Sequence, residues 1–237
     1  MGDEIEYKSL GKSTGLYAAA GDTICVPWVS EDPKDFFLTV RGRVVDKLTW
    51  VGGDHVKYGP IHGLIHRLRQ AHCIIGELAR VSDSYPTGET FSDVWWRTLV
   101  ANKTEECLPV PQGFGDGLLL VDHNIQDFCK FLLSMPPAQT KAQLANIIGL
   151  PYYRAMYACY TVHQIAVTET GLLVLAPLLA EAGDQICILN GGAVPFVLKS
   201  RKRPLRGYQL VGECYIHGLM NGEGMQGEYE VREICLY

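Results

Sequence analysis

The C-terminal third of the chain contains one compact set of residue types that could do chemistry: Glu213, Cys214 and His217 lie within five positions. A cysteine beside a histidine can act as a nucleophile, because the imidazole removes the thiol proton. If 208–217 is one strand, however, residues 213, 215 and 217 share one face and Cys214 lies on the other. We therefore expect Cys214 to face the core, and Glu213, Tyr215 and His217 to line a polar face or to hydrogen-bond the loop at 218–222.

His62 and His66 form a second candidate set, because the His-x3-His spacing on a helix can place both imidazoles on one metal ion. Gly63 stands where a metalloprotease would carry its general-base glutamate. Both histidines also flank an apolar helical stripe, which favours a structural role. We predict no metal and no cofactor.

A basic segment, KSRKRPLR at 199–206, places five cations in eight residues between two predicted strands. Arg201, Lys202 and Arg203 are its candidates for contact with a phosphate or an acidic partner. The same charges could instead form a solvated turn that protects a sheet edge from pairing. The sequence leaves both interpretations open.

Composition narrows the class of protein. The 237 residues carry a formal net charge of -5, which gives no general electrostatic attraction to nucleic acid or to anionic lipid. No apolar run reaches the roughly 18 residues of a membrane span, and the N-terminus has no apolar signal segment. Eight cysteines occur without a Cys-x-x-Cys pair, which is typical of reduced, structural thiols. We predict a cytoplasmic protein that binds neither nucleic acid nor membranes.

The elements that must position these residues follow a sheet, helix, sheet order. Dense β-branched and aromatic residues predict strands over 22–28, 36–40, 42–51, 164–168, 171–175, 184–189, 193–199 and 208–217. Apolar residues at helical spacing predict helices over 60–79, 92–100, 122–134, 140–148 and 152–162.

This order predicts a single α+β domain over 1–237. Its barrel-like antiparallel β-sheet would be built from a β part at 1–55 and a β part at 164–237, with a central helical insertion at 56–163. Asn190-Gly191-Gly192 between two apolar runs predicts a hairpin, since these residues tolerate positive φ.

Three blocks resemble a known family. The segments GDQICIL (183–189), GGAVPFVL (191–198) and LVGECYIHGLMNGE (210–223) are similar to the C-terminal signature of fungal heterokaryon-incompatibility proteins. WWRTLVAN (95–102) resembles that family's aromatic-Trp-Arg-Thr-Leu segment, and LTVRGRVVD (38–46) resembles its strand pair after the effector domain. The resemblance implies the C-terminal region of such a protein, without its N-terminal effector domain.

The departures from the family pattern limit what this resemblance carries over. The effector domain's Ser-Tyr-(Val/Thr)-Trp-Gly and Asp-x-(Ile/Leu)-Cys-Ile-(Asn/Asp)-Gln motifs do not occur in the sequence. The cell-death activity attributed to that domain is therefore not expected of this chain. His163-Gln164-Ile165-Ala166 also stands where the family usually reads Arg-x-Phe-Phe.

Three functional hypotheses remain open. The resemblance implies a non-catalytic regulatory or interaction domain in fungal self/non-self recognition, which would bind a protein partner or an unknown small molecule. The alternative is a cofactor-free enzyme or small-molecule-binding protein that uses Glu213, Tyr215 and His217 in a pocket between helices and sheet. A truncated gene product without activity of its own is the third.

Overall fold

The computed structural model describes residues 10, 15–30, 37–52, 73–74, 76–80, 82, 84–115, 151–201, 207–227 and 230–237. Residues 73–74 and 76–80 are helical, as the prediction over 60–79 requires there. The rest of that helix lies outside the described residues, as do the predicted helices over 122–134 and 140–148. His62, His66, Lys202 and Arg203 also lie outside them.

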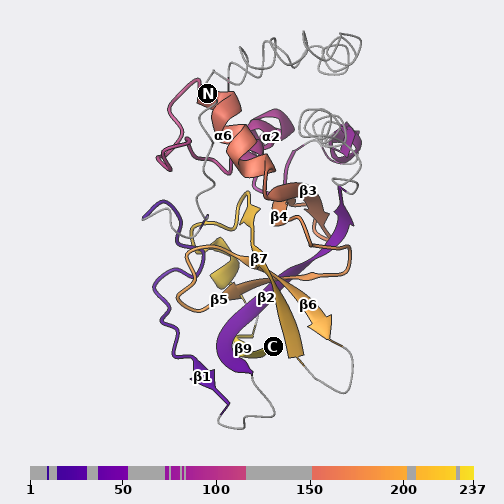
Figure 1. Cartoon of the computed structure of the whole chain (residues 1–237). Helices are drawn as coiled ribbons and strands as arrows, with labels where there is room; N and C mark the ends of the chain where they lie inside the picture. The colour runs from indigo at the N-terminus through magenta and orange to yellow at the C-terminus, as the bar shows by residue number, and fades with distance from the viewer. Residues whose placement is uncertain are drawn as a thin grey trace, which may run out of the picture.

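The sheet is organised around β2 (Leu38–Val51), a strand of 14 residues that pairs with four others (Figure 1). Its N-terminal part pairs with β1 (Trp28–Val29) and β9 (Arg232–Leu236), its middle with β5 (Gln185–Leu189), and its C-terminal part with β3 (His163–Thr168). The N-terminal and C-terminal strands therefore form one sheet, as predicted.

Five strands close into a ring. β5 continues to β6 (Phe196–Arg201), β6 to β7 (Gly207–Glu213), and β7 to β9, which returns to β2. The pairs are antiparallel except for β7 with β9. Beyond β3, the strands β4 (Leu173–Pro177) and β8 (Tyr215–Ile216) leave the ring as a separate edge, so we describe a ring of strands and not a barrel.

Gly42 shows why the ring can close at β2. It pairs with Leu189 of β5 and with Arg232 of β9, so strands approach it on both edges. A Cβ at this position would lie 2.7 Å from the carbonyl oxygen of Ile188. Only glycine allows so close a backbone approach without moving β5.

Two helices cover β3 and β4 at one end of the sheet (Figure 1). α2 (Phe91–Leu99) begins at Thr90, whose hydroxyl accepts a hydrogen bond from the amide of Asp93 at 3.1 Å, as an N-cap residue does. α6 (Pro151–Tyr160) packs against α2, and the Tyr152 hydroxyl donates to the Trp96 carbonyl at 2.9 Å. Both faces of β3 are buried, so its sequence is an uninterrupted buried run.

Four points of the strand prediction need correction. The predicted strands 36–40 and 42–51 are joined in the single strand β2. Of 22–28, only the end is a strand, in β1; residues 23–27 belong to no strand, and Ile24 and Val26 are exposed. Predicted strand 208–217 is interrupted at Cys214, whose amide donates to the Pro195 carbonyl instead of continuing a ladder. β9 was not predicted. The division into 1–55, 56–163 and 164–237, and the central insertion as a whole, stay predictions.

Candidate functional site

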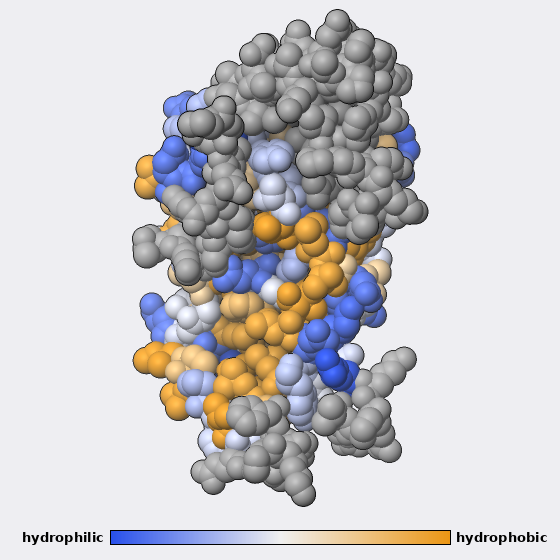
Figure 2. All heavy atoms as spheres, viewed as in Figure 1, coloured by the Kyte–Doolittle hydropathy of each residue, from blue (hydrophilic) through white to orange (hydrophobic). Residues whose placement is uncertain are grey.

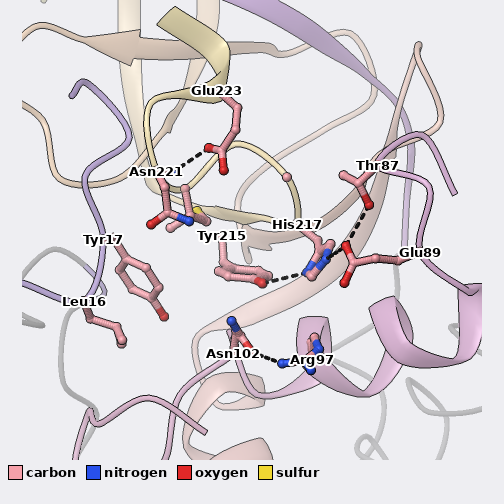
Figure 3. Close-up of a pocket in the computed structure, with 12 residues that line it drawn as sticks. Leu16, Tyr17, Thr87, Glu89, Arg97, Asn102, Tyr215, His217, Asn221 and Glu223 are labelled. Atoms are coloured by element: carbon pink, nitrogen blue, oxygen red, sulfur yellow. Dashed lines mark hydrogen bonds and ion pairs between the residues drawn. The ribbon is translucent and has the colours of Figure 1, made fainter.

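A pocket of about 380 Å³ lies where the N-terminal segment, the turn before α2, the end of α2 and the segment after β8 meet (Figure 3). Segments that are far apart in the sequence therefore build it together. Its lining residues are Leu16, Tyr17, Thr87, Glu89, Arg97, Asn102, Tyr215, His217, Gly218, Met220, Asn221 and Glu223.

A chain of hydrogen bonds crosses the pocket from the core to the rim. The Tyr215 hydroxyl lies 3.0 Å from Nδ1 of His217, and Nε2 of His217 lies 2.6 Å from Oε2 of Glu89. Thr87 donates to the same carboxylate oxygen at 2.7 Å. Tyr215 is 2% exposed, whereas the Glu89 side chain is 41% exposed. The polar chain thus connects a buried phenol to solvent (Figure 3).

The electrostatics assign the protons along this chain. Burial alone would raise the pKa of Glu89, but hydrogen bonds from Thr87 and His217 and the charges of His217 and Arg97 hold it below its usual value. An ionised Glu89 only accepts hydrogen bonds, so Nε2 of His217 carries a hydrogen. In the neutral ring Nδ1 then accepts from Tyr215, whose pKa is raised well above its usual value by burial.

The buried side chain of Tyr85 holds the backbone of this site in place from the core side. Its hydroxyl accepts from the amide of Leu173 in β4 at 2.8 Å and donates to the carbonyl of His217 at 3.2 Å. Its ring meets the His217 ring edge-on, with centroids 5.8 Å apart. Tyr85 is 1% exposed, and burial raises its pKa, so it stays a neutral hydrogen-bonding group. The position of His217 is therefore set by the core.

The end of α2 supplies the cationic side of the pocket. Arg97 stacks on the Trp96 ring at 4.4 Å, and its Nη1 donates to Oδ1 of Asn102 at 3.0 Å. The chain turns back here through Ala101 and Asn102, both with a φ of +51°, a left-handed conformation that asparagine tolerates better than alanine. Tyr17 closes the turn by donating to the Ala101 carbonyl.

The structure separates the residues that the sequence grouped together. Tyr215 and His217 line the pocket, but Glu213 does not; it lies at the end of β7, where it interacts with His163. Cys214 is fully buried in the core, and burial raises the pKa of its thiol well above the usual value. Alternation does not extend through 208–217 because the strand breaks at Cys214.

The other candidates lie away from the pocket. Arg201, at the end of β6, donates to Gln209 at 3.1 Å on the exposed surface, and Lys199 forms an ion pair with Glu181 at 2.9 Å. Among the residues that the structure describes, no group of three or more His, Cys, Asp and Glu side chains could hold a metal ion. Every cysteine within those ranges is a free thiol.

Of the residues that line the pocket, the sequence predicted only Tyr215 and His217 as site residues. Glu89 and Thr87 lie in a turn with no chemical motif, and only the long-range contact with His217 reveals their role. Arg97 and Asn102 had a signal, because both belong to the 95–102 block that resembles the family. Two of the resembling blocks, 95–102 and 210–223, thus meet in one pocket.

Comparison with known proteins identifies the type of region that this chain carries. Residues 137–236 match the family model described as the Het-6 beta-barrel domain. These residues contain the part of the pocket from Tyr215 to Glu223, while Thr87 to Asn102 precede them. The chain therefore has a C-terminal region of the heterokaryon-incompatibility type, as the sequence blocks predicted.

One curated relative is the heterokaryon incompatibility protein 6, OR allele, of Neurospora crassa, which is 38% identical over 61 residues. The match covers 24% of this chain and 8% of that protein, so the chain spans less than a tenth of that relative's length. No solved structure matches. Within the described residues, no helix is both long and apolar enough to cross a bilayer.

Proposed function

We propose that the chain is a non-catalytic regulatory domain in fungal self/non-self recognition, and that it senses a small molecule or a partner in the pocket around His217. One observation carries the proposal: two segments that resemble the heterokaryon-incompatibility family, 95–102 and 210–223, build this pocket together. In this proposal the chain acts in the cytoplasm.

The geometry of the polar chain supports binding more than catalysis. Both ring nitrogens of His217 are already hydrogen-bonded, to Tyr215 and to Glu89. Tyr215 remains a neutral phenol, and the candidate nucleophile Cys214 faces the core and is not activated. Groups that are held in fixed positions suit recognition, because little conformational entropy is lost when a ligand binds.

The alternative is a cofactor-free enzyme, and one observation favours it. The Glu89–His217 pair, at 2.6 Å, resembles the carboxylate-oriented imidazole of a general base. An enzyme would convert its ligand at a rate that depends on His217, whereas the regulatory domain that we propose returns its ligand unchanged. Mass analysis of a bound ligand after release therefore distinguishes the two.

A cell-based experiment tests the proposal. Wild-type chain, Asn102→Gly and Arg80→Lys are expressed in a filamentous fungus, hyphae are fused with those of an isolate lacking the chain, and death of the fused cells is scored. We expect the wild type and Arg80→Lys, which alters an exposed helix position, to change the fraction of dying cells equally. Asn102→Gly should abolish this change. The proposal would be overturned if the wild-type chain did not change the fraction of dying cells, or if Asn102→Gly changed it as much as the wild type does.

A further inference from the structure

One side of the pocket is a set of hydrogen-bond donors that the protein holds in place. Arg97 is fixed by its stacking on Trp96 and by its bond to Asn102. Its Nε is buried and has no hydrogen-bond partner in the described part of the chain. The stacking and the bond to Asn102 therefore fix the orientation of the guanidinium group that lines the pocket.

The opposite side of the pocket carries acceptors. Glu223 lies across the pocket from Arg97 and Asn102, beside Asn221 (Figure 3). One of its oxygens accepts from the Asn221 amide at 2.6 Å. Glu89 already accepts hydrogen bonds from the side chains of Thr87 and His217, whereas no described side chain is shown to donate to Glu223.

This division of charge selects a class of ligand. An anion alone would bind Arg97 but be repelled by Glu223, and a cation alone would be attracted by Glu223 but repelled by Arg97. A planar carboxylate matches the fork of a guanidinium, and an ammonium group matches a carboxylate. Leu16, Tyr17 and Met220 add apolar wall between the two ends. A volume of about 380 Å³ has room for such a molecule.

We propose that this pocket binds a free α-amino acid with an apolar side chain, whose carboxylate lies on Arg97 and Asn102 and whose ammonium group faces Glu223. This inference rests on the proposed function, because it names the ligand of the same pocket. It places the apolar side chain of the ligand against Leu16, Tyr17 and Met220.

Calorimetric titration of the purified chain with L-leucine, L-methionine and L-phenylalanine tests this assignment. We expect saturable binding of at least one of them. The matching amino-acid amide, which lacks the carboxylate, and the N-acetyl derivative, which lacks the ammonium, should each bind at least about tenfold more weakly.

Two variants and one control locate the site. Arg97→Lys removes the guanidinium fork, and Asn102→Gly removes the amide at a left-handed φ that glycine adopts without strain. Each should weaken binding at least about tenfold, while Arg80→Lys on the exposed surface should not change it. If Arg97→Lys lowers the circular-dichroism signal of the folded state, Asn102→Gly alone decides.

Three results would overturn the assignment: no binding of any of the three amino acids, equal binding of the amide or N-acetyl derivative, or unchanged binding by Asn102→Gly. The cell-based experiment separates this failure from failure of the proposed function. If amino acids do not bind but Asn102→Gly still abolishes the change in cell death, the pocket senses another ligand. If amino acids bind but the variants do not alter cell death, the proposed function is wrong.

Discussion

His163 and His217 are 3% and 7% exposed, but they lie in opposite surroundings. His163 begins β3 beneath α6, where its Nδ1 lies 3.2 Å from the carbonyl oxygen of Cys159. His217 faces the open pocket, and its Nε2 meets a carboxylate at 2.6 Å. Burial away from water lowers the pKa of His163 and keeps its ring neutral, although the hydrogen bond to the carbonyl works in the opposite direction. His217 is instead hydrogen-bonded to a carboxylate that reaches solvent. Similar burial therefore produces a sealed structural site and an open site that can respond to ligands.

The two regions also differ in what the surrounding chain contributes. The region around His163 includes Lys103, which is 5% exposed, and the charge of Lys103 further disfavours a protonated ring. The pocket region instead has its charged groups near solvent, at Glu89 and Glu223. We infer that the first region stabilises the fold and that the second can exchange partners at little cost to the fold.

The largest expected effect is a loss of stability in acid that comes from His163. Burial lowers the pKa of His163 from 6.5 to about 4. Below pH 6.5 the unfolded chain binds a proton that the folded chain refuses, so stability falls as the pH drops from 6.5 towards 4. The resulting loss of unfolding free energy approaches about 3 kcal/mol. Urea unfolding at pH 7, 6, 5 and 4.5 measures it.

His163→Asn provides the matched comparison, because an asparagine amide can replace the Nδ1 donor to the Cys159 carbonyl and does not titrate. The difference in pH dependence between wild type and variant isolates the histidine from the carboxylates. If the two unfold with the same pH dependence, His163 is already charged or accessible in the folded protein, and the comparison between the two sites fails.

The next effect is expected at Tyr85, which lies between the core and the pocket. Tyr85→Phe leaves the buried amide of Leu173 without its acceptor and should cost about 2 kcal/mol in unfolding free energy. Tyr208→Phe is the control, because the Tyr208 hydroxyl accepts from Arg232 in an exposed bond at 3.0 Å and its loss should cost well under about 1 kcal/mol. Thermal or urea unfolding compares them, and equal costs would mean that the Tyr85 bond is replaced by water.

Some strands could be predicted because their residues are buried on both sides. All six side chains of His163–Thr168 are buried, and the β-branched residues Ile165, Val167 and Thr168 indicate a strand there. The segment at 22–28 carries a similar apolar pattern, but Ile24 and Val26 are 80% and 83% exposed, and no strand within the described residues pairs with them. Figure 2 shows apolar surface across this face of the strand region. Composition cannot tell these two cases apart.

The site could be predicted only in part, because local sequence does not report contacts between distant segments. Tyr215 and His217 are close in sequence, so local alternation was enough to place them together. Glu89 reaches His217 across 128 positions, and no local rule connects a turn to a strand end. Glu213 was misplaced because the ladder ends before Cys214, and this interruption depends on a bond to the distant Pro195 carbonyl.

The smallest expected effect is at Glu89, and it tests the comparison from the open side. The pKa of Glu89 lies below its usual 4.5, so its contribution to stability is complete above that value and is lost as the pH falls through the lower folded value. Because the side chain is 41% exposed, Glu89→Gln should cost less than about 1 kcal/mol at pH 7, and the cost should shrink in high salt.

Glu77→Gln is the control, because Glu77 forms an exposed ion pair with Arg80. Its cost in unfolding free energy is that of removing an ordinary surface charge. Urea unfolding of both variants at pH 7 and pH 4, in low and high salt, makes the measurement. If Glu89→Gln lowers the unfolding free energy as much as Tyr85→Phe does, the Glu89–His217 pair stabilises the fold, as His163 does, and the contrast between the two histidines is wrong. A cost close to that of Glu77→Gln means that the pair can open for a ligand without unfolding the core that Tyr85 holds.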